Sequence, residues 1–157
     1  MQLTHTPART FVGISLSMSL LDNKTVELWR QFMPHRHAIT GRVGVEMYSL
    51  QVYPEGYYQQ FNPANAFEKW ALVEVVPGTI PPEGMKVFLL PQGDYVMFVH
   101  KGDISTFVQK LQYVLQEWIP ASGLLLDERP HFEILGEKYR NGDPESEEEV
   151  WVPVRRP

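Results

Sequence analysis

The 157-residue chain contains no cysteine. That absence excludes disulfides, thiolate catalysis and cysteine-ligated zinc. No apolar run approaches the roughly 18 residues of a membrane-spanning helix, so we expect no membrane contact. The first ten residues, MQLTHTPART, do not combine a basic segment with an apolar one and do not resemble a signal peptide. A cytoplasmic location is therefore the expected one.

Ligands for metals, phosphates and nucleic acids are also scarce. The chain has five histidines, and His35 and His37 stand two positions apart without further ligands nearby. Since zinc needs three or four ligands, we expect no metal. Gly93 and Gly102 lack the spacing of a phosphate-binding loop, and no nucleophile elbow is present, so no cofactor is predicted. No basic patch follows a strand or helix, which argues against direct nucleic-acid binding.

The net charge of −5 comes from one short segment. Residues 143–149 (DPESEEE) hold five acids and no base, and the remaining 14 acids match the 14 lysines and arginines. Such a run is usually a solvated loop. Its alternative role, as an acidic surface for a protein partner, stays open at this stage.

What the sequence does contain is enough apolar residues, 43% with 12% aromatic, to build one packed domain over residues 1–157. Period-two stretches and helical periodicity alternate along it. Helices are predicted near residues 24–33, after Asp22 and Asn23, and over 104–118, capped by Asp103 or Ser105 and ended by Pro120. Strands are predicted at 9–18, 44–52, 68–76, 85–90, 94–100, 131–136 and 148–154.

The order of these elements repeats. Residues 85–90 and 94–100 are predicted to form a hairpin across Pro91-Gln92-Gly93, and without the first of them both halves read strand–helix–strand–strand. Two such units predict an α+β fold, with an antiparallel sheet and both helices on one of its faces. The other face is then open, and we expect a central ligand cleft there.

The last two strands carry polar residues among apolar ones. Alternation places Glu133 with His131 and Leu135 on one face of its strand, and Trp151 with Glu149 and Pro153 on one face of the next. If the intervening valines face the helices, Trp151 faces the open side, and we expect Glu133 there too. A carboxylate beside an indole suits a bound cation. The alternative is an exposed Glu133 with its carboxylate in water.

Other aromatic residues lie in or beside strands: Tyr48, Trp70, Tyr95 and Tyr139. They are candidates to line an apolar pocket with hydroxyl or indole groups, although each is also suited to an ordinary core. Trp29 and Trp118 fall on the apolar faces of the predicted helices and are expected to pack against the sheet.

Several of these segments together resemble the GyrI-like family, which includes the effector-binding domains of bacterial multidrug-responsive regulators. The likeness spans most of the chain and is most specific in its last third. The family often has tyrosine where this chain has Leu135. The matching segments are Gly93-Asp94-Tyr95 through His100-Lys101-Gly102, Trp118-Ile119-Pro120 with Ser122-Gly123, Phe132-Glu133, Asp143-Pro144, and Glu149-Val150-Trp151-Val152-Pro153-Val154.

The resemblance implies a small-molecule-binding domain without a DNA-binding module, whose cleft takes lipophilic and often cationic molecules. The family's binding glutamate corresponds to Glu133, and the aromatic residue of its last strand to Trp151. Tyr48, Trp70 and Tyr95 are assigned to the ligand site from strand position alone.

Two other functions stay open. Some stand-alone members of the family hydrolyse cyclopropane-containing compounds, with Glu133 here as the candidate base and Tyr95 or Tyr139 as the candidate donor. Others inhibit gyrase, which would involve the acidic segment and a protein partner. Binding and hydrolysis both need Glu133 in the cleft, whereas inhibition does not.

Overall fold

The computed structural model describes residues 1–136 and 147–157. Its helical elements are α1 (Thr25–Phe32), the 3-10 helix η1 (Met33–Ala38), α2 (Ile104–Tyr113), the π-helical turn η2 (Val114–Trp118) and α3 (Ile119–Ser122). Its strands are β1 (Gln2–Thr6), β2 (Arg9–Met18), β3 (Met47–Val52), β4 (Phe67–Val75), β5 (Lys86–Leu90), β6 (Gly93–Lys101), β7 (Leu125–Leu126), β8 (His131–Leu135) and β9 (Glu147–Arg155).

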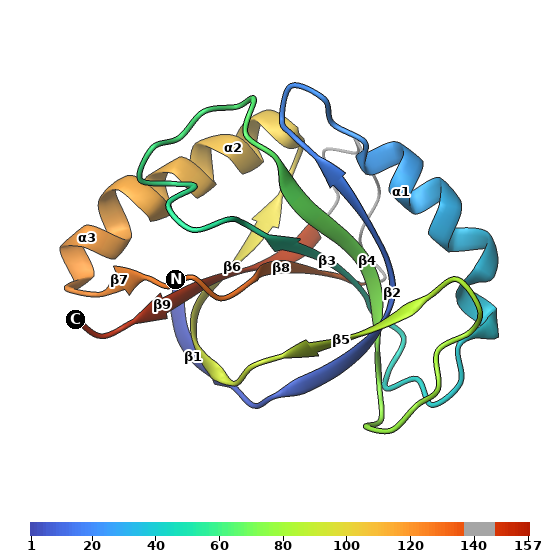
Figure 1. Ribbon diagram of the computed structural model, residues 1–157. Helices are drawn as coiled ribbons and strands as arrows, with labels where there is room; N and C mark the ends of the chain where they lie inside the picture. The colour runs from blue at the N-terminus through green and yellow to red at the C-terminus, as the bar shows by residue number, and fades with distance from the viewer. Residues whose placement is uncertain (137–146) are drawn as a thin grey trace.

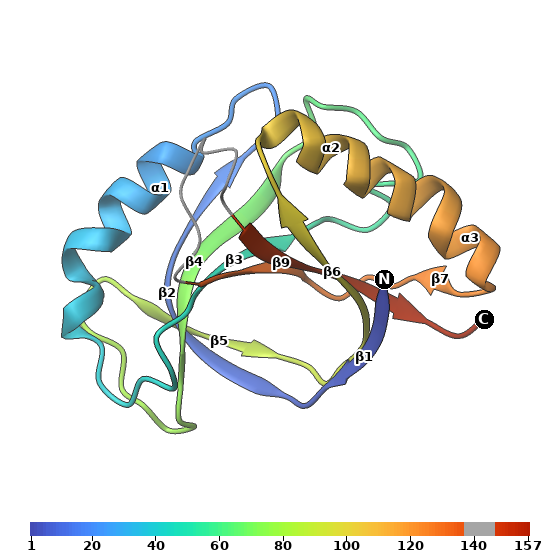
Figure 2. The same ribbon diagram turned by 180° about the vertical axis from the view of Figure 1, so that it is seen from behind.

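All strand pairs are antiparallel, and eight strands run in the order β1-β6-β9-β8-β3-β4-β2-β5, with β7 beside β9. The units β2-α1-β3-β4 and β6-α2-β8-β9 meet where β3 pairs with β8. Figures 1 and 2 show α1 and the α2–α3 rod on the same side of the sheet. The predicted α+β fold of two strand–helix–strand–strand units is therefore confirmed. None of the described helices is long and apolar enough to cross a membrane.

The predicted hairpin between β5 and β6 is wrong. Strand β5 pairs with β2, whereas β6 pairs with β1 and β9. Thr6 lies opposite Gly93 and Arg9 opposite Leu90, so the two chain segments turn the same corner side by side. Pro7 and Pro91 stand at this corner, where a residue without a backbone N–H costs no ladder hydrogen bond. Strand β1 therefore precedes the first unit in the chain but pairs with the second, and β5 precedes the second unit but pairs with the first.

Helix α2 begins as predicted, because the Asp103 carboxylate accepts hydrogen bonds from the N–H groups of Ser105 and Thr106. The helical rod formed by α2, η2 and α3 does not end at the predicted Pro120 but continues to Ser122. The Ile119 N–H bonds the Val114 carbonyl in a wider π-turn, and Pro120 then occupies the first turn of α3, where its missing N–H is tolerated. Gly123, with φ of 80°, ends the rod.

Helix α1 is close to its predicted bounds. The predicted N-cap at Asp22 or Asn23 is wrong, because Lys24 occupies that position without a side-chain capping bond. Asn23, two positions before the first helical residue, still accepts a hydrogen bond of 3.0 Å from the Thr25 N–H. Pro34 stands in the first turn of η1, which continues the rod as a tighter helix.

The face under the helices contains two apolar clusters. One lies beneath α1 and includes Val12, Leu28, Phe32 and Val73. The other lies beneath α2 and α3 and includes Val96, Val114, Val150 and Val152. Half-buried Trp29 packs against the first and Trp118 against the second, as predicted.

The opposite face is not open. The corner of β1, β2, β5 and β6 curls beneath the sheet (Figure 1), and the space is filled by one buried cluster: Phe11, Tyr48, Leu50, Trp70, Leu72, Leu90, Tyr95, Phe132 and Trp151. The Arg9 guanidinium lies 5.8 Å from the Trp151 ring centroid and 3.5 Å from the Glu74 carboxylate. A cation of the protein itself therefore occupies this aromatic surface.

This arrangement makes Trp151 a core residue. Its ring stacks on Phe132 at a centroid distance of 5.3 Å. We expect Trp151→Ala to lower the free energy of unfolding by about 3–5 kcal/mol, since it leaves a cavity. Urea unfolding would measure this loss. Tyr113→Ala, at a side chain that is 46% exposed, should change stability by only about 0.5 kcal/mol. Equal effects of the two substitutions would contradict the assignment.

Candidate functional site

Strand register separates Glu133 from Trp151. On β8 and β9, Phe132 lies opposite Trp151, whereas Glu133 lies opposite Val150. Directly paired residues share a face of the sheet, and Val150 belongs to the cluster under α2. Glu133 therefore lies on the helix face and Trp151 on the other. The prediction that they share a face is wrong, although the alternation within each strand was assigned correctly.

The other predicted site residues stay with Trp151. Tyr48, Trp70 and Tyr95 belong to its cluster, and their polar atoms have partners within the protein. The Tyr95 hydroxyl donates to the Pro130 carbonyl at 2.8 Å, and the Trp70 indole donates to Glu68. The structure thus does not bring these aromatic residues to Glu133. Tyr139 lies outside the described residues.

The centre of the helix face is polar. Between the two apolar clusters lies a row of side chains that we call the polar strip: Ser49 and Gln51 on β3, Lys69 on β4, His100 on β6, His131 and Glu133 on β8, and Glu148 on β9. Gln51 donates from its amide nitrogen to Ser49 Oγ at 3.2 Å and to Glu133 Oε1 at 3.1 Å. The two units thus hold Glu133 jointly.

Burial raises the pKa of Glu133 to about 7, and the Lys69 charge and the Gln51 hydrogen bond oppose that rise. Burial also raises the pKa of Glu148. His100 accompanies Glu148, with Nδ1 at 3.2 Å from its carboxylate and Nε2 at 2.9 Å from the Thr106 hydroxyl of α2. The polar strip therefore contains two carboxyl groups whose ionised forms are disfavoured by burial.

The segment between β3 and β4, which we call the aromatic segment, was not assigned to the site by the sequence analysis. Residues 53–61 (YPEGYYQQF) contain three tyrosines and one phenylalanine, a density that was the available signal. The ring of Tyr53 lies 4.9 Å from that of His131, and the ring of Tyr58 lies 5.5 Å from it. His131 shares its face of β8 with Glu133, so this aromatic segment lies against one end of the polar strip.

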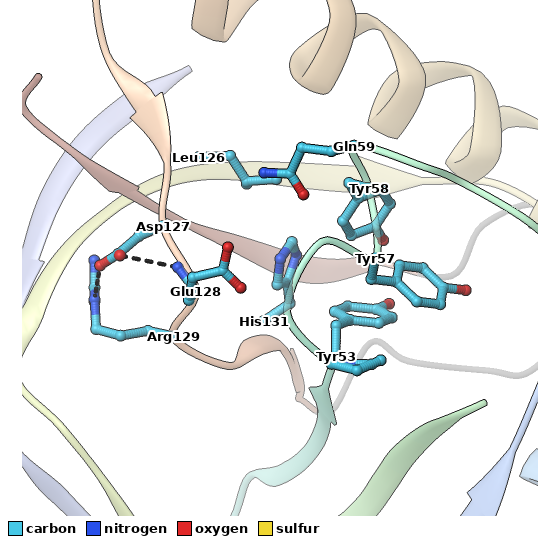
Figure 3. A pocket seen from close by; sticks show the side chains of 10 residues that line it. Tyr53, Tyr57, Tyr58, Gln59, Leu126, Asp127, Glu128, Arg129 and His131 are labelled. Atoms are coloured by element: carbon cyan, nitrogen blue, oxygen red, sulfur yellow. Dashed lines mark hydrogen bonds and ion pairs between the residues drawn. The ribbon is translucent and has the colours of Figure 1, made fainter. Parts of the chain in front are cut away.

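A narrow pocket opens at this point. Figure 3 shows His131 at its centre, between the aromatic segment and the connection from β7 to β8. The pocket is lined by Tyr53, Pro54, Tyr57, Tyr58, Gln59, Leu126, Asp127, Glu128, Arg129 and His131. Its cavity volume of about 20 Å³ is enough for about one water molecule.

The pocket is lined by ionisable side chains as well as by aromatic rings. Burial lowers the pKa of His131 to about 3, so the imidazole is neutral. Its ring lies against those of Tyr53 and Tyr58. Glu128 also lines a second, more open hollow beside Glu55 and Gln59. This second hollow, which shares Gln59 and Glu128 with the first, is therefore acidic, and this favours the approach of a cation.

Two further predictions concern metals and the acidic segment. Within the described part of the chain, no group of three or more histidine, aspartate or glutamate side chains is arranged to hold a metal ion. Residues 143–146 of the acidic segment lie outside the described residues. Glu148 and Glu149 lie in β9, which confirms the strand predicted at 148–154, and β9 also includes Glu147. The interpretation of the acidic run as a solvated loop is therefore wrong for residues 147–149.

Comparison with known proteins agrees with this fold. The sequence profile of the GyrI-like small molecule binding domain matches residues 1–155. The chain belongs to the GyrI-like family. It is 27% identical over 154 residues to the transcriptional regulator BrlR of Pseudomonas aeruginosa, covering 98% of this chain and 54% of BrlR. The chain thus spans about half the length of that relative.

Several solved structures share this fold. SAV2435 bound to tetraphenylphosphonium superposes with a TM-score of 0.63 at 17% identity, covering 98% of this chain and 93% of that one. The C-terminal domain of EcmrR gives 0.72 at 15% identity, covering 99% and 97%. A hydrolase from Listeria innocua gives 0.64 at 13% identity, covering 98% and 91%. At these identities the likeness concerns the fold.

The raised pKa of Glu133 has a measurable consequence for stability. The folded state binds the Glu133 proton more tightly than the unfolded chain, because the pKa rises from its ordinary 4.5 to about 7. The free energy of unfolding should therefore fall as the pH rises through this interval. Glu133→Gln should remove this component, as measured by urea unfolding at pH 5 and pH 8.

Carbon-13 NMR of the Glu133 carboxyl measures the same property directly. We expect a titration midpoint near 7. For the urea unfolding experiment, Glu83→Gln, at an exposed position, is the matched control. A midpoint near 4.5 would show that the carboxylate is solvated.

Proposed function

We propose that this domain binds lipophilic cations on the helix face of its sheet, between α1 and α2, with Glu133 opposing the ligand charge. The observation that carries this proposal is a half-buried carboxylate, whose pKa burial raises, beside an aromatic segment. Tyr53, Tyr58 and His131 provide ring surfaces, and Glu133 provides the charge. Membership of a small-molecule-binding family and the tetraphenylphosphonium bound to SAV2435 support the choice of ligand class.

The chemistry of the site favours cations over neutral molecules of the same size. A carboxylate removed from water loses hydration that an arriving cation replaces by direct attraction. Aromatic rings add cation–π attraction of about 0.5–2 kcal/mol. A diffuse charge surrounded by phenyl groups suits both the carboxylate and the aromatic rings, because such an ion loses little hydration when it enters an apolar pocket.

The ligand must displace part of the protein. A cavity volume of about 20 Å³ is far below the several hundred Å³ that drug-sized ligands occupy. The aromatic segment is the element that we expect to move, since it connects two strands without belonging to the sheet. Its outer residues Gln59, Gln60 and Phe61 are exposed. Opening would extend the pocket from His131 along the polar strip to Glu133.

Replacing the carboxylate tests the proposal. At pH 8.5, where Glu133 is ionised, Glu133→Gln should weaken tetraphenylphosphonium binding about 30-fold or more, as expected for the loss of a desolvated charge pair. Neutral triphenylphosphine oxide should bind the variant as it binds the parent. Isothermal titration calorimetry measures both affinities.

Two control variants complete this experiment. Tyr58→Ala should weaken both probes, because it removes ring surface rather than charge. Glu83→Gln removes an exposed carboxylate and should change neither affinity. If Glu133→Gln binds tetraphenylphosphonium as tightly as the parent does, Glu133 is not the recognition carboxylate and the proposal fails.

Hydrolysis of electrophilic cyclopropanes is the second candidate function. A glutamate with a pKa of about 7 suits a general base at neutral pH. Tyr95 is no longer a suitable donor, because its hydroxyl is bonded to Pro130 on the other face. Mass spectrometry after incubation with an ester-activated cyclopropane would test for a water adduct. We expect any turnover to vanish in Glu133→Gln, and binding without product would contradict catalysis.

A further inference from the structure

Lys69 is the positive charge of the polar strip. It lies on β4 directly opposite Gln51 of β3, and Gln51 in turn holds Glu133. The Lys69 ammonium donates to the Thr25 hydroxyl at 3.2 Å. Thr25 is the first residue of α1, so Lys69 joins the centre of the sheet to the start of that helix.

This position is electrostatically poor for an ammonium group. Burial lowers the pKa of Lys69, and the start of α1 presents the positive end of a helix dipole. Glu133 and Glu148 act in the opposite direction and favour the charged form. The two carboxylates, which belong to the other unit across the junction of β3 and β8, therefore offset part of the cost of burying the Lys69 charge.

We propose that Lys69 is the internal counter-cation of Glu133 and restricts the site to lipophilic monocations. This inference rests on the proposed function, because it concerns the ligand that meets the same carboxylate. A bound cation and Lys69 share the attraction of Glu133 and repel each other. A single diffuse charge tolerates that repulsion, whereas a second charge near the strip would add to it.

Neutralising Lys69 should therefore improve cation binding. At pH 8.5 we expect Lys69→Met to bind tetraphenylphosphonium about tenfold more tightly and triphenylphosphine oxide within about twofold of the parent, by order-of-magnitude Coulomb arithmetic. The dication dequalinium should gain more than tetraphenylphosphonium does. Lys69→Arg keeps the charge and should behave as the parent. Lys86→Met, at an exposed position of β5, is the control for net charge.

A second measurement does not involve a ligand. Removing Lys69 should move the NMR titration midpoint of the Glu133 carboxyl upward, because the Lys69 charge lowers that pKa. An unmoved midpoint would overturn the counter-cation assignment. If Lys69→Met does not fold, as judged by circular dichroism, Lys69→Gln supplies the same loss of charge with a polar side chain.

The outcomes separate the two proposals. If Glu133→Gln weakens tetraphenylphosphonium binding but Lys69→Met leaves the ratio of cation to neutral affinity unchanged, the Lys69 inference fails and the proposed function stands. If Glu133→Gln has no effect on either probe, the proposed function fails and the Lys69 inference fails with it. A selective gain in Lys69→Met together with a loss in Glu133→Gln supports both.

Discussion

The pairing of β8 with β3 on one side and β9 on the other decides which side chains meet at the middle of the sheet. Because a shift of one residue moves every side chain of a strand to the opposite face, this register alone places Glu133 under the helices and Phe132 against Trp151. The hydrogen bond from Gln51 to Glu133 crosses the junction of the two units. The polar strip, the Lys69 charge and the proposed site all depend on that junction.

The two faces of the sheet serve different purposes. On the face away from the helices, aromatic side chains pack together, the Arg9 guanidinium lies over the Trp151 ring, and Glu74 forms an ion pair with Arg9; these contacts stabilise the fold. On the helix face, the polar strip interrupts an otherwise apolar surface between α1 and α2. Buried polar groups cost free energy unless they are paired, and the raised pKa of Glu133 reflects that cost. A ligand cation would relieve it, which is why the helix face is the better candidate.

Local sequence signals predicted much of this architecture. The bounds of β2, the Asp103 cap and the order of both units follow from periodicity and capping chemistry. Features that are set by pairing between distant segments of the chain were not predicted. Three features depend on contacts with segments that are distant in the sequence, so no local pattern predicts them. They are the register between β8 and β9, the pairing of β1 with β6 and of β5 with β2, and the continuation of the helical rod past Pro120. Consequently the sequence reasoning selected Glu133, whose pKa burial raises, but placed it with the wrong set of aromatic residues.

The location of a bound cation tests the central claim most directly. Tetraphenylarsonium carries the same diffuse charge as tetraphenylphosphonium, and the anomalous scattering of its arsenic would mark the charge centre in a co-crystal. The account predicts one arsenic peak on the helix face, close to the Glu133 carboxylate, with Tyr58 or Tyr53 against a phenyl ring. A peak beside Trp151 on the opposite face, or only at the surface, would contradict it.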